Sequence, residues 1–506
     1  MSIRRQIILV CALALGATLV APGAAGQDKD SRGANSSPTA SGVLTPCEVP
    51  GPEEDVKEKA RCGTYEAFEN RVTKSGRKIK LKIVVFPATG PDKAADPLFY
   101  IPGGPGSSAT EDAPYIAQQY AKIRERRDLV FVDQRGTGES NPLNCDLFDP
   151  HDLQSYLGVY FPLEGVRKCR EQLELKADLR LYTTPIAMDD LDEVRAALGY
   201  ARINIIGTSY GTRAAQVYLK RHGEHVRAVI LHGVSPTGQL MPRDFPQHTE
   251  RALNGVVDEC AVDEACRGAF PDLRAEVKTV LDRLLRGPVE VNLKNAQTGA
   301  SIPLKLSRDL AAEAIRYMLY QPESASRIPL YIHQAAQGNF APLARSALLY
   351  RRQIVATGSN GMYLSVTCAE DLPWIKPGEG ERNAEHTFLG DYRLRQQRAA
   401  CALWPRADVP RDYAEPTRAA VPALILTGQW DPVTPPTYGE AASKYLPNSL
   451  NLVVPHGGHG FGGLEGLECV PNLVAEFIER GTTSGLDTSC LKNIRRKGFV
   501  LKPAGP

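Results

Sequence analysis

The sequence predicts an α/β fold, in which helices flank a mostly parallel central sheet and a large, mostly helical insertion interrupts the core. Two observations predict this fold. Apolar runs of strand length alternate with helical patterns up to Gly233 and resume after residue 420, which is the rhythm of βαβ units. Between these parts, helical patterns dominate and convincing strands are few. We therefore expect a first core segment at residues 61–233, an insertion at 234–420 and a second core segment at 421–506.

Residues 1–26 have the order of a secretory signal peptide: a short basic start, an apolar run, and small residues that end near Ala25 and Gly26. The apolar run falls short of the roughly 20 residues that span a bilayer. Residues 27–60 are predicted to be a flexible leader, because most of this stretch is rich in Ser, Gly, Pro and Ala without periodic apolar positions. The mature protein is expected to be secreted or periplasmic, with no membrane attachment once the signal is removed.

The charges of the chain are almost balanced. The 506 residues include 60 Lys and Arg against 58 Asp and Glu, and removing residues 1–26 takes away Arg4 and Arg5 but no acid, which leaves 58 against 58. Such a balance gives no electrostatic footprint for nucleic acid. With 42% hydrophobic residues, the composition also excludes a disordered chain.

Ten of the 11 cysteines remain once Cys11 leaves with the signal, and an even number in an exported chain predicts disulfides. Pairing sequence neighbours closes the shortest loops, although it is one of many possible connectivities. Zinc is the competing interpretation, but the chain has no Cys-x-x-Cys pair and no finger or ribbon spacing, so no metal is expected.

The first core elements begin with residues 79–85, where apolar residues alternate with mostly Lys, as in a half-buried antiparallel strand. Residues 98–101 and 129–132 are continuous apolar runs, each followed by a loop with glycine, which suits strands covered on both faces. A capped helix is then predicted from Thr184 to Leu198, with proline in its first turn.

The next elements are a buried strand at 203–206, an Ala-rich helical stretch at 213–221 and a strand at 226–231. Within the insertion, residues 307–320 and 326–337 carry helical patterns. The sheet resumes with strands at 423–426 and 450–454, followed by a helix at 467–480.

The pentapeptide Gly207-Thr-Ser-Tyr-Gly211 matches the G-x-S-x-G pattern and lies between an apolar strand and a helix. In this context the serine sits in a strained turn, where side chains at the two glycine positions would collide with the neighbouring strand and helix. The turn presents the hydroxyl of Ser209 above the sheet. The motif therefore predicts Ser209 as a nucleophile, against the alternative of an ordinary Ser-Gly turn.

A serine hydroxyl needs a general base, and the base needs a carboxylate that fixes its tautomer. With a serine at such a turn, the chain order is Ser, Asp, His. Asp431 and His459 fit this order, and each follows a predicted strand, where an open α/β sheet keeps its sites. The alternatives are a turn-capping role for Asp431 and the use of His456 as the base.

The glycine-rich loop Pro102-Gly-Gly-Pro-Gly106 follows an early strand and occupies the place of an oxyanion loop. We predict that the backbone N–H groups of Gly104 and Tyr210 form the oxyanion hole. The loop lacks both the P-loop lysine and the dinucleotide-binding spacing, so neither a nucleotide site nor a cofactor is expected.

With these motifs in hand, the chain resembles the exported proline iminopeptidase and tripeptidyl aminopeptidase family of α/β-hydrolase serine peptidases. Pro102 departs from the histidine that many iminopeptidases have before the glycines, which weakens assignment to the strictly proline-specific branch. The segments that carry the resemblance are Gly103–Gly106, Asp133–Ser140, Gly207–Thr212, Gly428–Pro436 and Gly458–Gly460.

The resemblance implies an α/β-hydrolase fold with a large, mostly helical cap over a triad of Ser209, Asp431 and His459. Such a cap would admit short peptides and exclude folded chains. An aminopeptidase must also bind a free α-ammonium, and the acidic cap segment points to Glu370, with Asp371 in reserve. The alternative is a solvated acidic pair. Asp133 and Arg135 are expected to brace the loop near the oxyanion glycines.

The predicted function is that of a secreted serine exopeptidase, which releases N-terminal residues or tripeptides from short peptides with a free N-terminus. One alternative is an esterase or lipase on the same fold, which would ignore the substrate's amino group. A second is a catalytically silent binding protein, which predicts a missing triad residue, whereas the sequence has all three.

Overall fold

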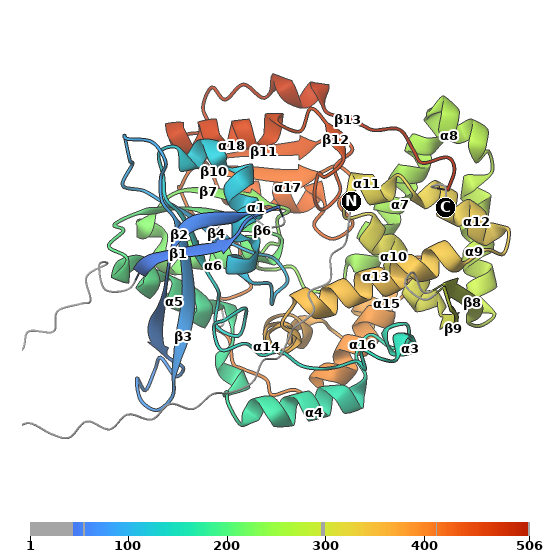
Figure 1. The fold of residues 1–506 in the computed structure, drawn as a ribbon, viewed down its shortest axis with the longest axis horizontal. Helices are drawn as coiled ribbons and strands as arrows, with labels where there is room; N and C mark the ends of the chain where they lie inside the picture. The colour runs from blue at the N-terminus through green and yellow to red at the C-terminus, as the bar shows by residue number, and fades with distance from the viewer. Residues whose placement is uncertain (1–43, 54–55, 295–298, 411, 504–506) are drawn as a thin grey trace, which may run out of the picture. The chain divides into compact units, whose positions relative to one another are not determined.

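One nine-stranded sheet organises the computed structural model, which describes residues 44–53, 56–294, 299–410 and 412–503 (Figure 1). The strand order is β1-β2-β3-β5-β4-β6-β7-β10-β11. From β5 to β11 neighbouring strands pair in parallel, whereas β1, β2 and β3 pair antiparallel. The strands are β1 (Leu44–Pro50), β2 (Lys57–Phe68), β3 (Lys78–Phe86), β4 (Leu98–Ile101), β5 (Leu129–Val132), β6 (Ile203–Thr208), β7 (Val226–His232), β10 (Ala423–Gly428) and β11 (Ser449–Val454).

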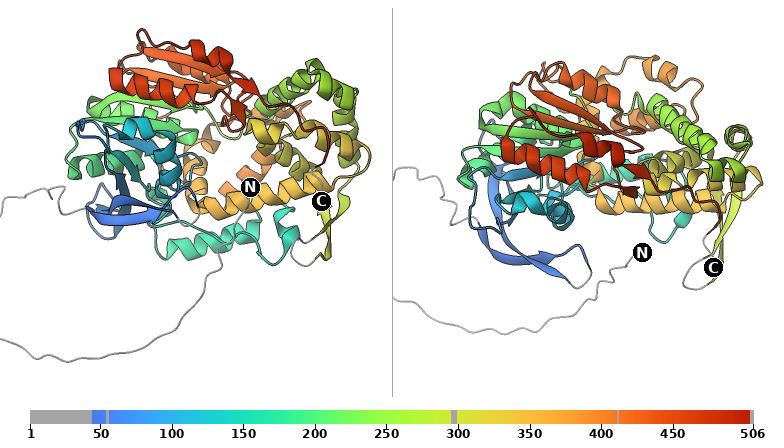
Figure 2. Two further views of the ribbon diagram at one scale, coloured as in Figure 1. Left: turned by 45° about the horizontal axis from the view of Figure 1, so that its top comes forward. Right: turned by 90° about the horizontal axis from the view of Figure 1, so that it is seen from above.

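Helices cover both faces of the parallel strands, which explains why these strands are continuous apolar runs. Along β4, Leu98 and Tyr100 pack with α1 and α18, while Phe99 and Ile101 pack on the opposite face with α5 and α6. Figure 2 shows the sheet between these helices. The helices beside the sheet are α1 (Ala109–Gln119), α2 (Ala121–Arg124), α5 (Thr184–Ala197), α6 (Tyr210–His222), α17 (Pro436–Ser443) and α18 (Cys469–Arg480), whereas α3 (Leu153–Tyr156) and α4 (Leu163–Glu174) pack against helices of the insertion.

The segment between β7 and β10 is mostly helical and gathers to one side of the sheet (Figure 1, Figure 2). It also contains an antiparallel hairpin, β8 (Val289–Lys294) and β9 (Ser301–Leu306), which the sequence patterns did not predict. Its helices are α7 (Phe245–Val262), α8 (Glu264–Ala269), α9 (Leu273–Leu285), α10 (Arg308–Met318), α11 (Pro322–Ala325), α12 (Ile328–Ala336), α13 (Ala341–Thr357), α14 (Asn360–Glu370), α15 (Glu379–Ala384) and α16 (Tyr392–Cys401).

The expectation of a flexible leader over residues 27–60 needs correction. Its described end forms β1 and the start of β2, which pair antiparallel and are linked by the Cys47–Cys62 disulfide. The composition hid these strands because β1 lies at the sheet edge, where most of its side chains face solvent and need not be apolar.

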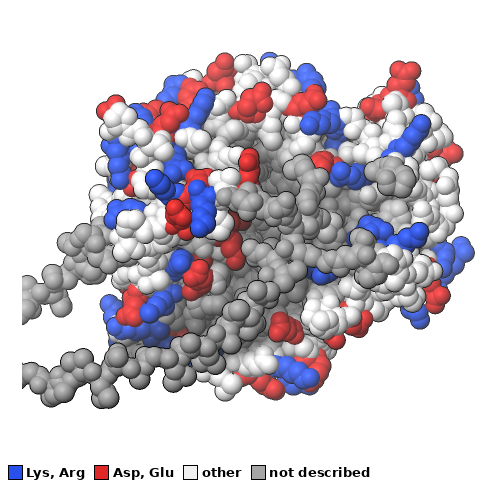
Figure 3. Space-filling model, viewed as in Figure 1, with Lys and Arg blue, Asp and Glu red and all other residues white. Residues whose placement is uncertain are grey.

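The predicted signal peptide, residues 1–26, lies outside the described residues. Within the part of the chain that the structure describes, no helix combines the length and apolar character needed to cross a bilayer. Positive and negative side chains are intermixed over the face shown in Figure 3, as the balanced composition indicates.

The ten cysteines pair between sequence neighbours, as the shortest loop closures favoured. The Cys368–Cys401 disulfide ties α14 to α16, so it fixes two helices of the insertion to each other. The other four are Cys47–Cys62, Cys145–Cys169, Cys260–Cys266 and Cys469–Cys490.

Candidate active site

Ser209 occupies the turn between β6 and α6 with a positive φ of 57°. A non-glycine residue in this region of φ is uncommon, and it persists only where the surroundings enforce it. Here the Ser209 N–H donates to the carbonyl of His232 on β7 at 2.8 Å, which anchors the turn to the neighbouring strand.

The two glycines of the motif are required by close backbone approach. A Cβ at Gly207 would lie 2.4 Å from the carbonyl oxygen of Gly211, and one at Gly211 would lie 2.1 Å from that of Ile101. Both contacts are with backbone and cannot be relieved by a side-chain rotation. The serine is therefore presented by a turn that only this glycine pattern allows.

Asp431 and His459 come together from the loops after β10 and β11. The Nδ1 atom of His459 lies 2.8 Å from Oδ2 of Asp431. Backbone contact brings the two loops together, since a Cβ at Gly428 would lie 1.9 Å from the carbonyl oxygen of Gly458. The other ring nitrogen of His459, Nε2, has no partner among the described residues.

The carboxylate of Asp431 is fully buried and held as an anion. Its Oδ1 accepts from the N–H groups of Val433 and Thr434, each at 2.8 Å. Burial alone would raise the pKa of Asp431, but His459 and these N–H groups hold it below its ordinary value. A buried aspartate in this state orients the imidazole and stabilises its protonated form.

Sequence reasoning missed Thr434. Its hydroxyl donates to Oδ2 of Asp431 at 2.7 Å and lies 3.1 Å from Nδ1 of His459. The signal that could have found it is its spacing, because a threonine three residues after an aspartate often shares a turn with it.

His456, the alternative base, is turned to another partner. Its Nδ1 lies 2.7 Å from Oε1 of Glu259 on α7, and its side chain does not line the cavity described next. Of the two histidines in this loop, the structure brings only His459 to Asp431.

Ser209 and His459 line one cavity of about 400 Å³ between the sheet and the insertion. The oxyanion-loop residues Gly103 and Gly104 form part of its floor, and Met241 and Phe245 contribute from the insertion. Phe148, Tyr160 and Phe161, from the segment between β5 and α4, complete the apolar wall. The cavity combines apolar walls with a few convergent polar groups, which is typical of a site for a small ligand.

The two N–H groups predicted for the oxyanion hole are available. Gly104 lines the cavity, and Tyr210, directly after Ser209, opens α6. Among the described residues, neither backbone N–H donates a hydrogen bond. At the first position of a helix the N–H has no intrahelical acceptor, so that of Tyr210 is free for a ligand oxygen.

The structure does not bring Glu370 and Asp371 to this cavity, which corrects their expected place beside the substrate. Glu370 is 1% exposed and accepts bonds from the Thr184 N–H, the Thr184 hydroxyl and the Tyr413 hydroxyl. Asp371 is 0% exposed, and its Oδ1 accepts from Arg213 at 2.8 Å. Because both side chains are buried away from the cavity, an ammonium group could reach either carboxylate only if the surrounding structure opened.

Glu370 nevertheless predicts a pH-dependent stability. Burial raises its pKa from 4.5 to about 7, against the opposing effect of its hydrogen-bond donors. The folded state holds the proton of Glu370 more tightly than the unfolded chain does. The resulting contribution to the free energy of unfolding is therefore complete below pH 4.5, falls as the pH rises and is gone above about pH 7. Glu370→Gln should reduce the loss of unfolding free energy between low and neutral pH by up to about 3 kcal/mol.

Urea unfolding of the wild type and Glu370→Gln at pH 5 and pH 7.5 measures the difference. The exposed Glu385→Gln, in the same insertion, is the control and should follow the wild type. Equal pH dependence in all three proteins would contradict the prediction.

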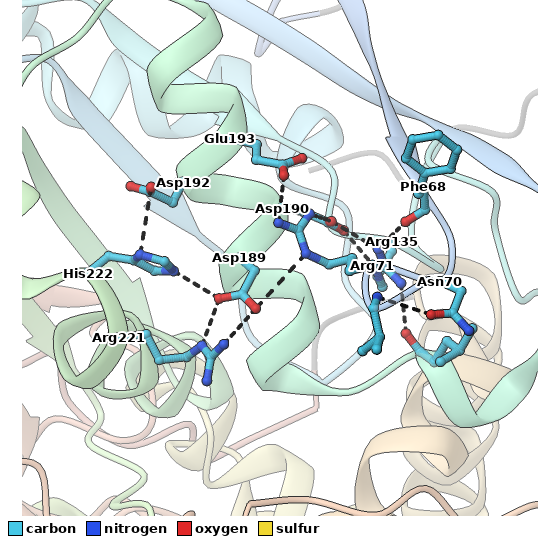
Figure 4. Close-up of polar contacts among 12 residues, drawn as sticks. Phe68, Asn70, Arg71, Arg135, Asp189, Asp190, Asp192, Glu193, Arg221 and His222 are labelled. Atoms are coloured by element: carbon cyan, nitrogen blue, oxygen red, sulfur yellow. Dashed lines mark hydrogen bonds and ion pairs between the residues drawn. The ribbon is translucent and has the colours of Figure 1, made fainter. Parts of the chain in front are cut away.

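Asp133 and Arg135 brace different parts of the fold. Asp133 accepts from the hydroxyls of Ser108 and Thr110, each at 2.8 Å, and so fixes the start of α1 just after the oxyanion loop. Arg135 instead binds Asp190 on α5 at 2.6 and 2.9 Å and the backbone carbonyl of Glu69 (Figure 4). The expected bracing of the oxyanion loop therefore applies to Asp133 alone.

A cluster that could hold a metal ion lies on the other side of α5 from Arg135 (Figure 4). Asp192, His222 and His225 place their ligand atoms within 4.8 Å of one another. Figure 4 shows His222 between Asp189 and Asp192. Asp192 already accepts bonds from Arg195 and Tyr218, so its carboxylate is satisfied within the protein.

Comparisons with known proteins find hydrolases that share the predicted fold. The family model for the alpha/beta hydrolase fold matches residues 96–462. The chain is similar to the serine protease Hip1 of Mycobacterium tuberculosis, with 27% identity over 88% of this chain and 90% of that protein. It is also similar to the tripeptidyl aminopeptidase of Streptomyces lividans, with 23% identity over 85% and 83%. Carboxylesterase B of Mycobacterium tuberculosis is 26% identical over 85% and 86%.

Among solved structures, the proline iminopeptidase of Mycobacterium smegmatis aligns at 15% identity over 83% of this chain and 98% of that one, with a TM-score of 0.37. The family match extends from just before β4 to just past His459, and so includes all the site loops. The chain belongs to the alpha/beta hydrolase fold family, and the resemblance to serine peptidases of this family is confirmed.

Proposed function

We propose that the protein is a serine peptidase that cleaves short peptides through an acyl-enzyme formed on Ser209. The observation that carries this proposal is one cavity lined by both Ser209 and His459, with Asp431 holding the imidazole from behind. The similarity to two peptidases over most of their length supports an amide as the bond cleaved.

In the proposed reaction, Ser209 Oγ attacks the scissile carbonyl carbon while its proton passes to Nε2 of His459. The N–H groups of Gly104 and Tyr210 stabilise the oxyanion, each by about 3 kcal/mol. His459 then protonates the leaving amine. In the second half, His459 takes a proton from water as the water oxygen attacks the acyl carbon, and it returns that proton to Ser209 Oγ as the ester bond breaks. These steps use side chains and backbone of this chain without a cofactor.

We propose an exopeptidase that removes N-terminal residues or tripeptides, as the similarity to a tripeptidyl aminopeptidase supports. A cavity of about 400 Å³ suits a short segment of peptide and excludes a folded chain. Among the described residues that line it, Asp112 is the one carboxylate, and it accepts from the Tyr100 hydroxyl at 3.1 Å. Asp112 is therefore our candidate for binding the substrate's ammonium group.

We also propose that the protein works outside the cytoplasm. Five disulfides are typical of an oxidising compartment. The predicted signal peptide agrees with this location.

Hydrolysis of a tripeptidyl reporter amide, with the N-terminus free or acetylated, tests the exopeptidase proposal. The free peptide should react at least about tenfold faster, the equivalent of one ion pair of about 1.4 kcal/mol. Asp112→Asn should raise KM about tenfold for the free peptide and leave the acetylated peptide unchanged. The control is Glu111→Gln, on the same helix but outside the cavity. Equal rates for both peptides would rule out recognition of the amino group.

An esterase is the second candidate, and two observations favour it over other hydrolases. The chain is similar to a carboxylesterase, and neither carboxylate of the acidic segment at 370–371 reaches the cavity. An esterase would hydrolyse acyl esters at rates that do not depend on a free amine. The third candidate is a binding protein without catalytic activity. Failure of Ser209 to react with a fluorophosphonate would favour this candidate.

A further inference from the structure

Three buried arginines of the insertion line the cavity that contains Ser209. Arg316 lies on α10, Arg351 on α13 and Arg393 on α16, and they are 1%, 2% and 2% exposed. Arginines on three separate helices converge on one space, although they are far apart in the sequence. Arginine is rarely this buried unless an anion accompanies it.

The protein supplies one carboxylate to this cluster, that of Glu313. Arg316 binds its Oε2 at 2.9 Å, and Arg393 approaches its Oε1 at 3.5 Å. Arg351 has no carboxylate within ion-pair distance among the described residues, and its Nη2 donates to the backbone carbonyl of Tyr160. Three cations thus face one anion.

The hydrogen-bonding capacity of two of these guanidinium groups is also unfilled. The Nε atoms of Arg351 and Arg393 are buried without a partner among the described residues. Their charges are partly stabilised by the ring of Tyr160, whose centroid lies 4.1 Å from Arg351 and 3.5 Å from Arg393. Burial favours the neutral phenol of Tyr160, yet the two arginines hold its pKa below the ordinary value.

The cluster begins beside the candidate base. The ring of Tyr320 lies 5.0 Å from that of His459, and its hydroxyl accepts from Arg316 at 2.7 Å. Arg316 in turn binds Glu313, which Arg393 also approaches. The ring of Tyr160 contacts both Arg393 and Arg351. A substrate held at Ser209 would extend into this wall. The cavity carboxylate Asp112, on α1, forms no ion pair with any of these arginines.

We propose that Arg351 and Arg393 bind a carboxylate of the substrate, so that the enzyme selects acidic peptides. This inference rests on the peptidase function proposed above and adds the substrate class. A carboxylate accepts two parallel N–H bonds from a guanidinium, and a buried pair of this kind discriminates strongly against a neutral amide. It would also supply the anion that the cluster lacks.

The carboxylate could come from two parts of a peptide. One source is an acidic side chain on the residue whose carbonyl is attacked, and the other is the α-carboxylate of a short peptide. Two matched pairs of substrates distinguish them. The first pair differs only by glutamate or glutamine before a reporter amide, and the second only by a free or amidated C-terminus.

The wild type should prefer the carboxylate member of one pair by at least about tenfold in kcat/KM. Arg351→Met should bring this ratio close to one, while Arg351→Lys should keep part of it. Arg393→Met tests the second arginine in the same way. The matched control is Arg352→Met, the next residue on α13, which is exposed and should keep the wild-type ratio.

Each ratio is measured on one preparation, so it does not depend on how much of a variant is folded. Ratios near one for both pairs in the wild type, with hydrolysis intact, would overturn this inference and leave the proposed function standing. A preference that survives both Arg351→Met and Arg393→Met would also overturn it. No hydrolysis of any of the four substrates, together with an unreactive Ser209, would overturn the proposed function itself.

Discussion

Ser209→Ala is expected to lower kcat by about a millionfold and to leave the fold intact. The Ser209 hydroxyl is the only protein group that forms a covalent bond to the substrate carbon in the proposed reaction, so its loss removes the acyl-enzyme pathway as a whole. The strained turn is held by Gly207, Gly211 and the bond to His232, none of which involves the hydroxyl. Alanine at this position should therefore fold like serine.

Release of a reporter amine and labelling by a fluorophosphonate measure the effect, and circular dichroism checks the fold. Ser235→Ala is a suitable control, because Ser235 lies outside the cavity and its buried hydroxyl has no partner among the described residues. The control should keep wild-type activity. A Ser209→Ala enzyme with more than about a thousandth of the wild-type rate would exclude Ser209 as the nucleophile.

Asp431→Asn is expected to lower kcat by about ten-thousandfold with little change in KM. The asparagine amide would donate to Nδ1 of His459, which currently lies 2.8 Å from a carboxylate oxygen. The imidazole would then carry its proton on Nε2 and could not accept the proton of Ser209. The new side chain has the same shape, and its oxygen can still accept from Val433 and Thr434.

A pH profile of kcat for the wild type and Asp431→Asn, with Asp408→Asn as the control, provides the measurement. Asp408 is exposed, so its replacement should leave the profile unchanged. Asp431→Asn activity within tenfold of the wild type would mean that another group orients His459.

Much of the core could be predicted because its sequence patterns are local. A parallel strand covered on both faces must be apolar along its length, and β4 and β5 coincide with the predicted runs. The turn that holds Ser209 could also be predicted, because backbone contacts require glycine at positions 207 and 211. Asp431 and His459 could be named because each follows a recognisable strand.

Other parts depend on contacts that no local pattern records. The edge strand β1 has mostly exposed side chains, so its composition resembled that of a leader. The acidic pair at 370–371 gave no sign of which way its carboxylates point, and both point into the protein interior. Arg316, Arg351 and Arg393 come from three helices and meet only in the folded insertion, so spacing could not group them.

The division of the reactive groups across the insertion also has a consequence for biosynthesis. Ser209 precedes the insertion, whereas Asp431 and His459 both follow it. Under the proposed chemistry, a chain made from its N-terminus carries the reactive hydroxyl long before the imidazole. A chain that stops within the insertion therefore has the hydroxyl but neither Asp431 nor His459, and it should be inactive until the whole insertion and the loop after β11 have been made.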